Sequence, residues 1–335
     1  MRFQRALGFA ILISTWLPLS SARRPRPAYY TRNFNTIASI YNFTIYPNQL
    51  PIIAQAANPS AAIPQIANLF NPKVTGRVQD IGNFTDFRTS IEYFFGLAPV
   101  PRAPTYVAFS AFDLTQFSSE CPSVAASTVY FTTAVADPSR PDFGKVLTYL
   151  KQSGFWHFDE QGRVDYYDLW IPALQDFTSI INEVDYSQRI VQLSTIKGVC
   201  QGAQKVCTGA NIQYKSNSRI NLGTVIAGLK LDPLLGGSLK LINQLKLTDL
   251  NAGELNCFAQ LSKKSFGTFD KLWSNSVTCR TVHLILAEVD PDVHCPHVGP
   301  TGGGKCVDYP YNNRLFGDIP LFGEKYRFKC PHDYL

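Results

Sequence analysis

Three side chains that can handle a proton lie close together in the sequence: His157, Tyr166 and Asp168. A histidine shuttles a proton near neutral pH when a carboxylate fixes its tautomer. If the segments on either side of Gly162 pair as a hairpin, all three side chains fall on one of its faces. They are the candidate catalytic residues. The alternative is that Asp168 caps the following helix while His157 packs beside aromatic rings.

The hairpin itself is predicted from two runs of aromatic and β-branched residues, 146–158 and 163–172, separated by a polar loop that ends in Gly162. Pairing Phe158 with Arg163 gives two faces. The face with fewer charges is predicted to point inward, and it carries Phe155, His157, Val164, Tyr166 and Asp168. The other face carries Trp156, Phe158, Arg163, Asp165 and Tyr167. On this assignment Phe155 and Tyr166 are candidate ligand-binding residues, and a slip of one residue would exchange the two faces.

A second group with possible chemistry lies near the C-terminus: His283, His294 and His297. Neutral imidazole is a ligand for zinc and copper, and Cys279 and His283 share one face of a predicted helix. However, cysteines of exported proteins usually form disulfides, and the segment 294–297 lacks the CxxC spacing of a closed zinc site. We therefore predict a disulfide-closed loop and no metal, with the three histidines as the alternative metal site. No cofactor is predicted.

The N-terminus has the pattern of a secretory signal peptide. Arg2 and Arg5 precede an apolar run over residues 6–17, and small residues follow at positions 20–22. We predict that residues 1–22 are removed, that residues 23–34 form a disordered basic stub, and that the protein is secreted to the cell exterior. The alternative is an uncleaved membrane anchor. No later run reaches the 18 apolar residues expected of a membrane span.

An even number of cysteines in an exported chain favours disulfides. We predict that all eight are oxidised: Cys121, Cys200, Cys207, Cys257, Cys279, Cys295, Cys306 and Cys330. Cys295 and Cys306 are each expected to pair within the C-terminal half, and the remaining pairing stays open. Two sequons predict N-glycosylation at Asn42 and Asn83.

The remaining pattern predicts an α+β fold. Helices are expected near residues 35–55, 85–96 and 171–181, and strands near 74–81, 106–112 and 125–136. This order favours a curved antiparallel sheet packed on helices. After residue 185 the chain is predicted to be mostly helical, and loop-like from residue 291. The net charge of +6 is mild and no basic patch stands out, so nucleic acid is not expected as a partner.

Residues 154–168, GFWHFDEQGRVDYYD, resemble the long hairpin of NTF2-like (SnoaL-like) domains. The resemblance covers at most residues 35–181 and implies a cone-shaped sheet with an open pocket. In enzymes of this group, such as ketosteroid isomerases and dehydratases, acids, histidines and tyrosines project into the cone. No motif here matches their catalytic sets residue by residue. Residues 200–214 and 279–300 also resemble the cysteine-rich tail of secreted fungal proteins of unassigned function.

The sequence therefore predicts an NTF2-like domain over residues 35–184 and a helical, cysteine-rich extension over 185–335 packed on it. The function we expect is binding of a small apolar ligand in the pocket of a secreted protein. Two alternatives remain: an extracellular structural or interaction protein, and an enzyme of the isomerase or dehydratase type using His157 and Asp168. Whether the protein is an enzyme is left open.

Overall fold

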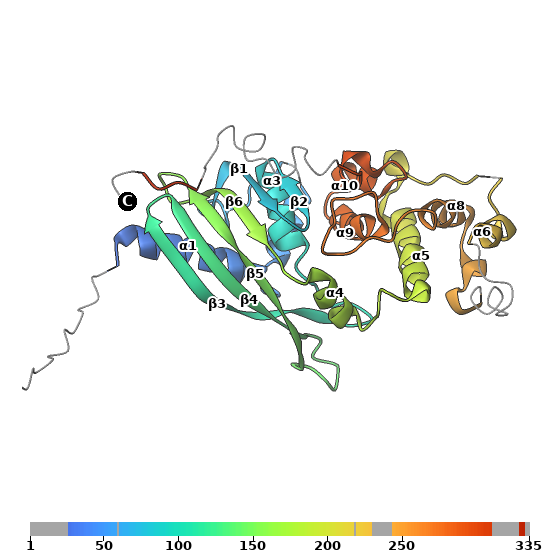
Figure 1. Cartoon of the computed structure of the whole chain (residues 1–335), viewed down its shortest axis with the longest axis horizontal. Helices are drawn as coiled ribbons and strands as arrows, with labels where there is room; N and C mark the ends of the chain where they lie inside the picture. The colour runs from blue at the N-terminus through green and yellow to red at the C-terminus, as the bar shows by residue number, and fades with distance from the viewer. Residues whose placement is uncertain (1–25, 59, 218, 230–242, 310–327, 332–335) are drawn as a thin grey trace, which may run out of the picture.

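The computed structural model describes residues 26–331, apart from 59, 218, 230–242 and 310–327. The predicted signal peptide, residues 1–22, lies outside the described residues. Two bodies lie side by side in Figure 1: a sheet body, residues 28–182, and a helical extension, residues 189–309. The domain boundary predicted between residues 184 and 185 stays a prediction.

The sheet body begins with a helix where the sequence predicted disorder. Helix α1 spans Ala28–Thr44, so residues 28–34 of the predicted stub are helical. The helix forms there because its buried face extends the apolar spacing of Ile37, Ile40 and Tyr41 toward the N-terminus, where Asn33 is also buried. A short helix, α2 (Leu50–Ala56), follows with Pro51 in its first turn, a position that tolerates proline.

Six strands form one mixed sheet in the order β2-β1-β6-β5-β4-β3. The strands are β1 (Phe70–Val78), β2 (Gly82–Phe84), β3 (Val107–Cys121), β4 (Val124–Val135), β5 (Val146–Phe158) and β6 (Val164–Trp170). Only the β1–β6 pair is parallel; the other four pairs are antiparallel. Helix α1 crosses one face of the sheet, and α4 (Leu174–Asn182) packs against β5 (Figure 1). The predicted α+β class, with a curved sheet packed on helices, is confirmed.

Helix α3 (Phe87–Ile91) starts where the sequence predicted, because the Asp86 carboxylate accepts a hydrogen bond from the backbone of Thr89. It continues directly into a π-helical turn, η1 (Glu92–Gly96). This turn supplies side chains to both candidate sites described below.

The predicted inward face of the hairpin is wrong. The observed register pairs Trp156 with Tyr167 and His157 with Tyr166, and a bulge follows before Phe158 pairs with Val164. Trp156 is fully buried in the core, whereas Phe155 is 52% exposed. The prediction chose the inward face as the one with fewer charges. It was wrong because Arg163 lies in the turn after Phe158 and Asp165 lies at the bulge, so neither charge is on the aromatic face that α1 covers.

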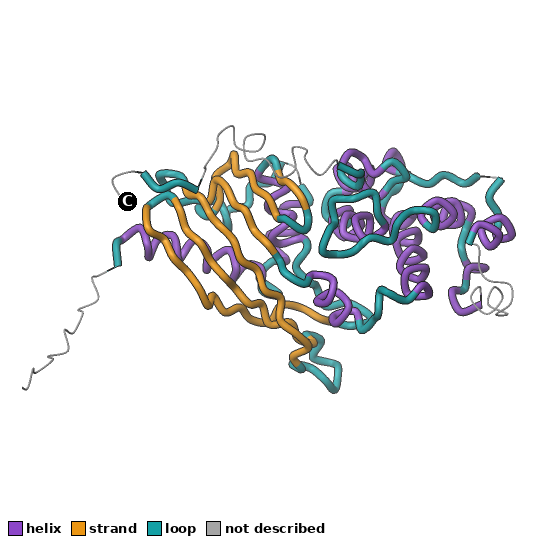
Figure 2. The backbone as a smooth tube through the Cα atoms, viewed as in Figure 1, coloured by secondary structure: helices purple, strands orange, loops and turns teal. Residues whose placement is uncertain are grey.

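The extension is mostly helical, as predicted (Figure 2). It contains α5 (Arg189–Val206), η2 (Gly209–Asn211), α6 (Leu222–Gly228), η4 (Leu247–Asp249), α8 (Ala252–Leu261), α9 (Val277–Ala287), α10 (Pro291–Val298) and η5 (Gly302–Gly304). The prediction of a loop from residue 291 is wrong for α10. There the Asp290 side chain caps the first turn and Pro291 occupies a first-turn position.

All eight cysteines form disulfides, as predicted. The pairs are Cys121–Cys330, Cys200–Cys257, Cys207–Cys295 and Cys279–Cys306. Cys295 and Cys306 each pair within the C-terminal half, also as predicted. Three bridges lie inside the extension, and the fourth ties residues 328–331 to the end of β3.

The two bodies are joined by hydrogen bonds at the β1–β2 turn. The backbone of Leu272 donates to the Asp80 carbonyl (2.7 Å), and the Trp273 indole donates to the Gln79 carbonyl (3.0 Å). Lys305 Nζ donates to the Asn83 carbonyl (3.0 Å). None of the helices in the described part of the chain is both long and apolar enough to cross a membrane.

The predicted glycosylation sites lie at the end of α1 and in β2. Asn42 is exposed and Asn83 is half-buried. Glycosylation of both remains a prediction.

Candidate functional site

The structure does not assemble the predicted catalytic residues. His157 Nδ1 lies 2.6 Å from Asp165 Oδ1, so Asp165 and not Asp168 orients this imidazole. Asp168 is instead paired with Arg77 and accepts a hydrogen bond from Gln79 (2.8 Å). The alternative role of Asp168 as a helix cap is also wrong, because the N-cap position of α4 is Ala173.

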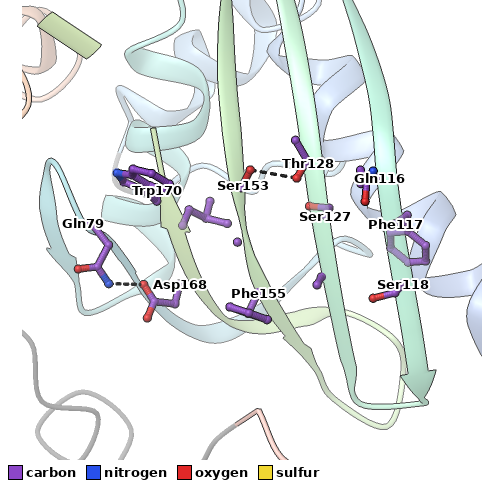
Figure 3. A pocket seen from close by; sticks show the side chains of 13 residues that line it. Gln79, Gln116, Phe117, Ser118, Ser127, Thr128, Ser153, Phe155, Asp168 and Trp170 are labelled. Atoms are coloured by element: carbon purple, nitrogen blue, oxygen red, sulfur yellow. Dashed lines mark hydrogen bonds between the residues drawn. The ribbon is translucent and has the colours of Figure 1, made fainter. Parts of the chain in front are cut away.

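The candidate ligand-binding residues lie on the outer face of the sheet. A hollow of about 420 Å3 lies there. Its lining side chains include Gln116, Thr128, Phe155 and Trp170 (Figure 3). Phe155 therefore lines a surface hollow, with its ring packed beside Phe328 of the tail. Tyr166 does not line this hollow; it is buried, also against Phe328.

A second cavity, of about 440 Å3, lies on the opposite, helix-covered face of the sheet. Its walls come from β3, β4, β5, η1, α4, α9 and adjoining loops. They are mostly apolar and include Phe94, Leu97, Phe109, Phe131, Leu150, Phe177, Leu272, Val282 and Ile285. This is the inside of the cone, and the sequence named none of its lining residues as a site. A polar residue, Gln152, lies between the inward-facing Leu150 and Trp156 on the same strand. This polar position on a buried face could have indicated the cavity from the sequence.

Two polar side chains in this cavity form a pair. Gln152 Nε2 donates to the Tyr93 hydroxyl oxygen (2.9 Å), and Gln152 Oε1 is buried with no hydrogen-bond partner among the described residues. Burial raises the pKa of Tyr93 well above its usual range, with the nearby Tyr167 adding to the effect. Tyr93 therefore stays protonated. The cavity thus offers a phenolic O–H donor beside an amide carbonyl acceptor.

The structure also brings together the three histidines of the alternative metal site. His283 Nδ1 lies 3.2 Å from His294 Nδ1 and 3.3 Å from His297 Nδ1. Glu92 Oε2, from η1 of the sheet body, lies 2.8 Å from His294 Nε2. No local pattern around the histidines indicates Glu92, which lies 202 positions away from His294 in the chain.

Two imidazoles of this cluster, those of His283 and His297, have lowered pKa values. Burial, reinforced by the neighbouring histidines, lowers the pKa of His283 well below its usual range. Burial lowers the pKa of His297 to about 4, with His294 adding to the effect. Cys279 and Cys306 lie beside His283 but are joined as a disulfide, so they offer no thiolate.

The sheet body has the architecture of an NTF2-like (SnoaL-like) domain: a curved sheet around helices that encloses a cavity on its concave face. Among solved structures, it is similar to a SnoaL-like polyketide cyclase from Jannaschia sp. CCS1, at 13% identity over 47% of this chain and 96% of that chain, with a TM-score of 0.32. A steroid delta-isomerase from Pseudomonas aeruginosa is 12% identical over 48% of this chain and 90% of that chain, with a TM-score of 0.29. Such scores say nothing about the activity of this chain.

In the extension, residues 252–309 match the sequence profile of the BfoA family C-terminal domain. The chain is 28% identical over 253 residues to the Aurasperone B biosynthesis cluster protein A of Aspergillus niger, covering 72% of this chain and 69% of the relative. It is 26% identical over 254 residues to the Bifonsecin B biosynthesis cluster protein A of Aspergillus brasiliensis, covering 72% of this chain and 71% of the relative. The homologues are thus fungal proteins named for secondary-metabolite biosynthesis clusters, and all three clustered histidines lie in the matched segment.

Proposed function

We propose that this protein is a secreted binder of a small aromatic metabolite that carries a hydroxyl group, held in the cavity on the concave face of the sheet. The observation that carries the proposal is the Tyr93–Gln152 pair in the lining of a mostly apolar cavity, with Gln152 Oε1 buried and without a hydrogen-bond partner among the described residues. A buried acceptor without a partner costs about 1–3 kcal/mol, which a ligand hydroxyl would recover. The volume of about 440 Å3 falls within the range of roughly 300–1,000 Å3 typical of small-molecule sites.

The polar pair selects a particular ligand chemistry. A single hydroxyl group can donate to Gln152 Oε1 and accept from the Tyr93 hydroxyl at the same time. The rings of Phe94 and Phe131 suit a flat aromatic body. The names of the homologues support a metabolite made by a biosynthesis cluster as the ligand.

Binding is favoured over proton-transfer catalysis. The described residues that line the cavity include no histidine, carboxylate or lysine that could act as a general base. His157 and Asp168, the candidates for isomerase chemistry, lie on the other side of the sheet. A purely structural or interaction protein would have its cone filled by side chains, and the cavity argues against that alternative.

Secretion is supported by the predicted signal peptide and by four disulfides, which persist in oxidising compartments. Mass spectrometry of the mature protein from culture medium tests this by its N-terminal residue. A chain that stays in the cell with residues 1–22 attached would contradict it.

The cavity is tested by titration calorimetry with 2-naphthol and, as a matched probe, 2-methoxynaphthalene, which accepts a hydrogen bond but donates none. We expect 2-naphthol to bind about tenfold more tightly, since one hydrogen bond is worth about 1 kcal/mol or more. Gln152→Leu should remove this preference. Gln116→Leu, on the outer hollow, should keep it. Loss of binding in Gln116→Leu alone would place the ligand on the outer face and refute the proposal.

A further inference from the structure

We infer that His283, His294 and His297 bind one Zn2+ ion and that this ion fastens the extension to the sheet body. Two of the ligands lie on α10 and one on α9, and the carboxylate that orients the cluster comes from η1. The inference concerns a site separate from the proposed ligand cavity, because neither Glu92 nor any of the three histidines lines that cavity.

The spacing of the nitrogens fits tetrahedral zinc. Zn–N bonds are about 2.0–2.1 Å long, so two ligands of a tetrahedral ion stand about 3.3–3.4 Å apart. The two Nδ1–Nδ1 distances from His283 are 3.2 and 3.3 Å. The three ligand nitrogens all lie within 4.8 Å of one another. Three histidines leave one position for water or another ligand.

Glu92 fixes the tautomer that metal binding requires. Its carboxylate accepts the hydrogen on His294 Nε2, which leaves the lone pair of His294 on Nδ1, the atom that faces the other two histidines. Carboxylate–histidine–metal arrangements of this kind orient the ligand and raise its basicity.

The burial of the Glu92 side chain is a second, independent observation. The residue is 2% exposed, and its other oxygen, Oε1, is buried with no hydrogen-bond partner among the described residues. A buried carboxylate is costly unless a positive charge lies near it. The one ion pair described for it is to His294, which carries a charge only when protonated. A divalent cation on His294 Nδ1 supplies the positive charge with the imidazole neutral.

Two cationic residues act against the ion. Lys305 and Arg280 both act electrostatically on His283, and the Lys305 amine is held by the Asn83 carbonyl. The negative charge of Glu92 offsets them in part. Removing this charge should therefore weaken zinc binding even though the three ligands remain.

The site also has a mechanical consequence. Glu92 precedes Tyr93 in the same π-helical turn, so the ion would hold the turn that presents Tyr93 to the cavity. An ion that binds only the folded protein increases the free energy of unfolding. The increase grows with the logarithm of the ratio of metal concentration to dissociation constant.

The test is a calorimetric titration of the metal-free, disulfide-intact full chain with ZnCl2. Elemental analysis of the titrated protein then gives the number of zinc ions per chain. We expect one Zn2+ per chain and a higher melting temperature. Substitution of Co2+ should give the intense visible absorption of a tetrahedral site. Reductant is left out so that thiolates from Cys279 and Cys306 cannot bind the ion.

Variants distinguish zinc binding by this cluster from zinc binding by other histidines. His294→Ala and His297→Asn should each weaken zinc binding more than tenfold, and Glu92→Gln by about 10- to 100-fold. His157→Ala, whose imidazole pairs with Asp165 on the sheet, should bind as the unchanged protein does. A cooperative thermal unfolding transition, followed by circular dichroism, establishes that each variant is folded. No zinc bound by the unchanged protein, or equal affinity in folded His294→Ala and His297→Asn, would overturn the inference.

Discussion

The sheet body and the extension are held together by different interactions. The sheet body has a large aromatic core in which Trp156 contacts the rings of Tyr41, Phe94 and Tyr167, and no disulfide lies within it. The extension has its own apolar core but adds three internal disulfides. From this difference we infer that apolar burial on one sheet face suffices for the first body, whereas the second depends on its covalent links as well as its core.

The extension also contains a buried polar centre built around one arginine, Arg280. Arg280 is fully buried and donates to the carbonyls of Ser276, Gly299 and Pro300 and to the Asn275 side chain. It fastens α9 to the segment that follows α10. The candidate zinc site lies along the same helix, so the extension orders its loops through polar and covalent contacts.

The largest expected effect comes from removing the covalent links. Replacing the six cysteines of the three internal bridges by alanine should unfold the extension, because each bridge contributes about 2–4 kcal/mol. The sheet body should remain folded. Limited proteolysis with mass spectrometry checks this: cleavage is expected within residues 189–309, with a resistant fragment over residues 28–182.

The matched control is the Cys121→Ala, Cys330→Ala double variant, which frees only the tail and should leave both bodies resistant to protease. Cleavage of the sheet body before the extension in the six-cysteine variant would reverse the comparison.

The second prediction tests which face of the sheet carries its stability. Trp156→Ala should lower the free energy of unfolding by about 3–5 kcal/mol, since the indole is fully buried and donates to Ser127. Trp170→Ala is the control on the same hairpin; its side chain is 52% exposed, and we expect a change within about 0.5 kcal/mol. Urea denaturation measures both. Similar losses would mean that the outer face is as well packed as the inner one.

The third prediction concerns the polar centre of the extension. Arg280→Leu should cost about 2–4 kcal/mol because it leaves several buried oxygens without donors. Arg189→Leu, at the exposed start of α5, should change stability little. The readout is hydrogen exchange of the amides in α9 and α10. Unchanged protection in Arg280→Leu would show that the disulfides alone order this region.

The smallest effect concerns the junction of the two bodies. Burial raises the pKa of Asp80 to about 6, and the nearby charge of Asp270 adds to the effect, although the hydrogen bond from the Ile171 amide opposes it. The Asp80 carboxyl group therefore binds its proton more tightly in the folded protein than in the unfolded chain, and protonation of Asp80 stabilises the fold. The stabilisation is complete below about pH 4 and is lost as the pH rises through about 6.

Asp80→Asn should flatten this dependence, because the amide oxygen can still accept from Ile171 while no charge develops. The change between pH 4 and 7 should be at most about 1–2 kcal/mol once solvent screening is considered. Melting temperatures of both proteins across this range provide the measurement. An equal slope in the variant would assign the pH dependence to other groups.

Part of the fold could be predicted because it depends on neighbouring residues. The caps at Asp86 and Ser276 are local contacts of this kind, since each side chain accepts a hydrogen bond from the backbone N–H three positions ahead. The oxidation of all eight cysteines was predicted from their even number in a chain with a predicted export signal. The candidate site was predicted less well: the three histidines were named, but as the alternative, and the cavity residues were not.

By itself, the sequence determined the α+β class, the helical extension and the ends of several helices, because these follow from composition and from contacts within one turn. The tertiary structure alone decided which face of the hairpin is buried, since the bulge after His157 and the position of α1 set that choice. It alone decided the disulfide pairing and the contact of Glu92 with His294. These join segments far apart in the chain, and local pattern carries no information about which distant segments meet.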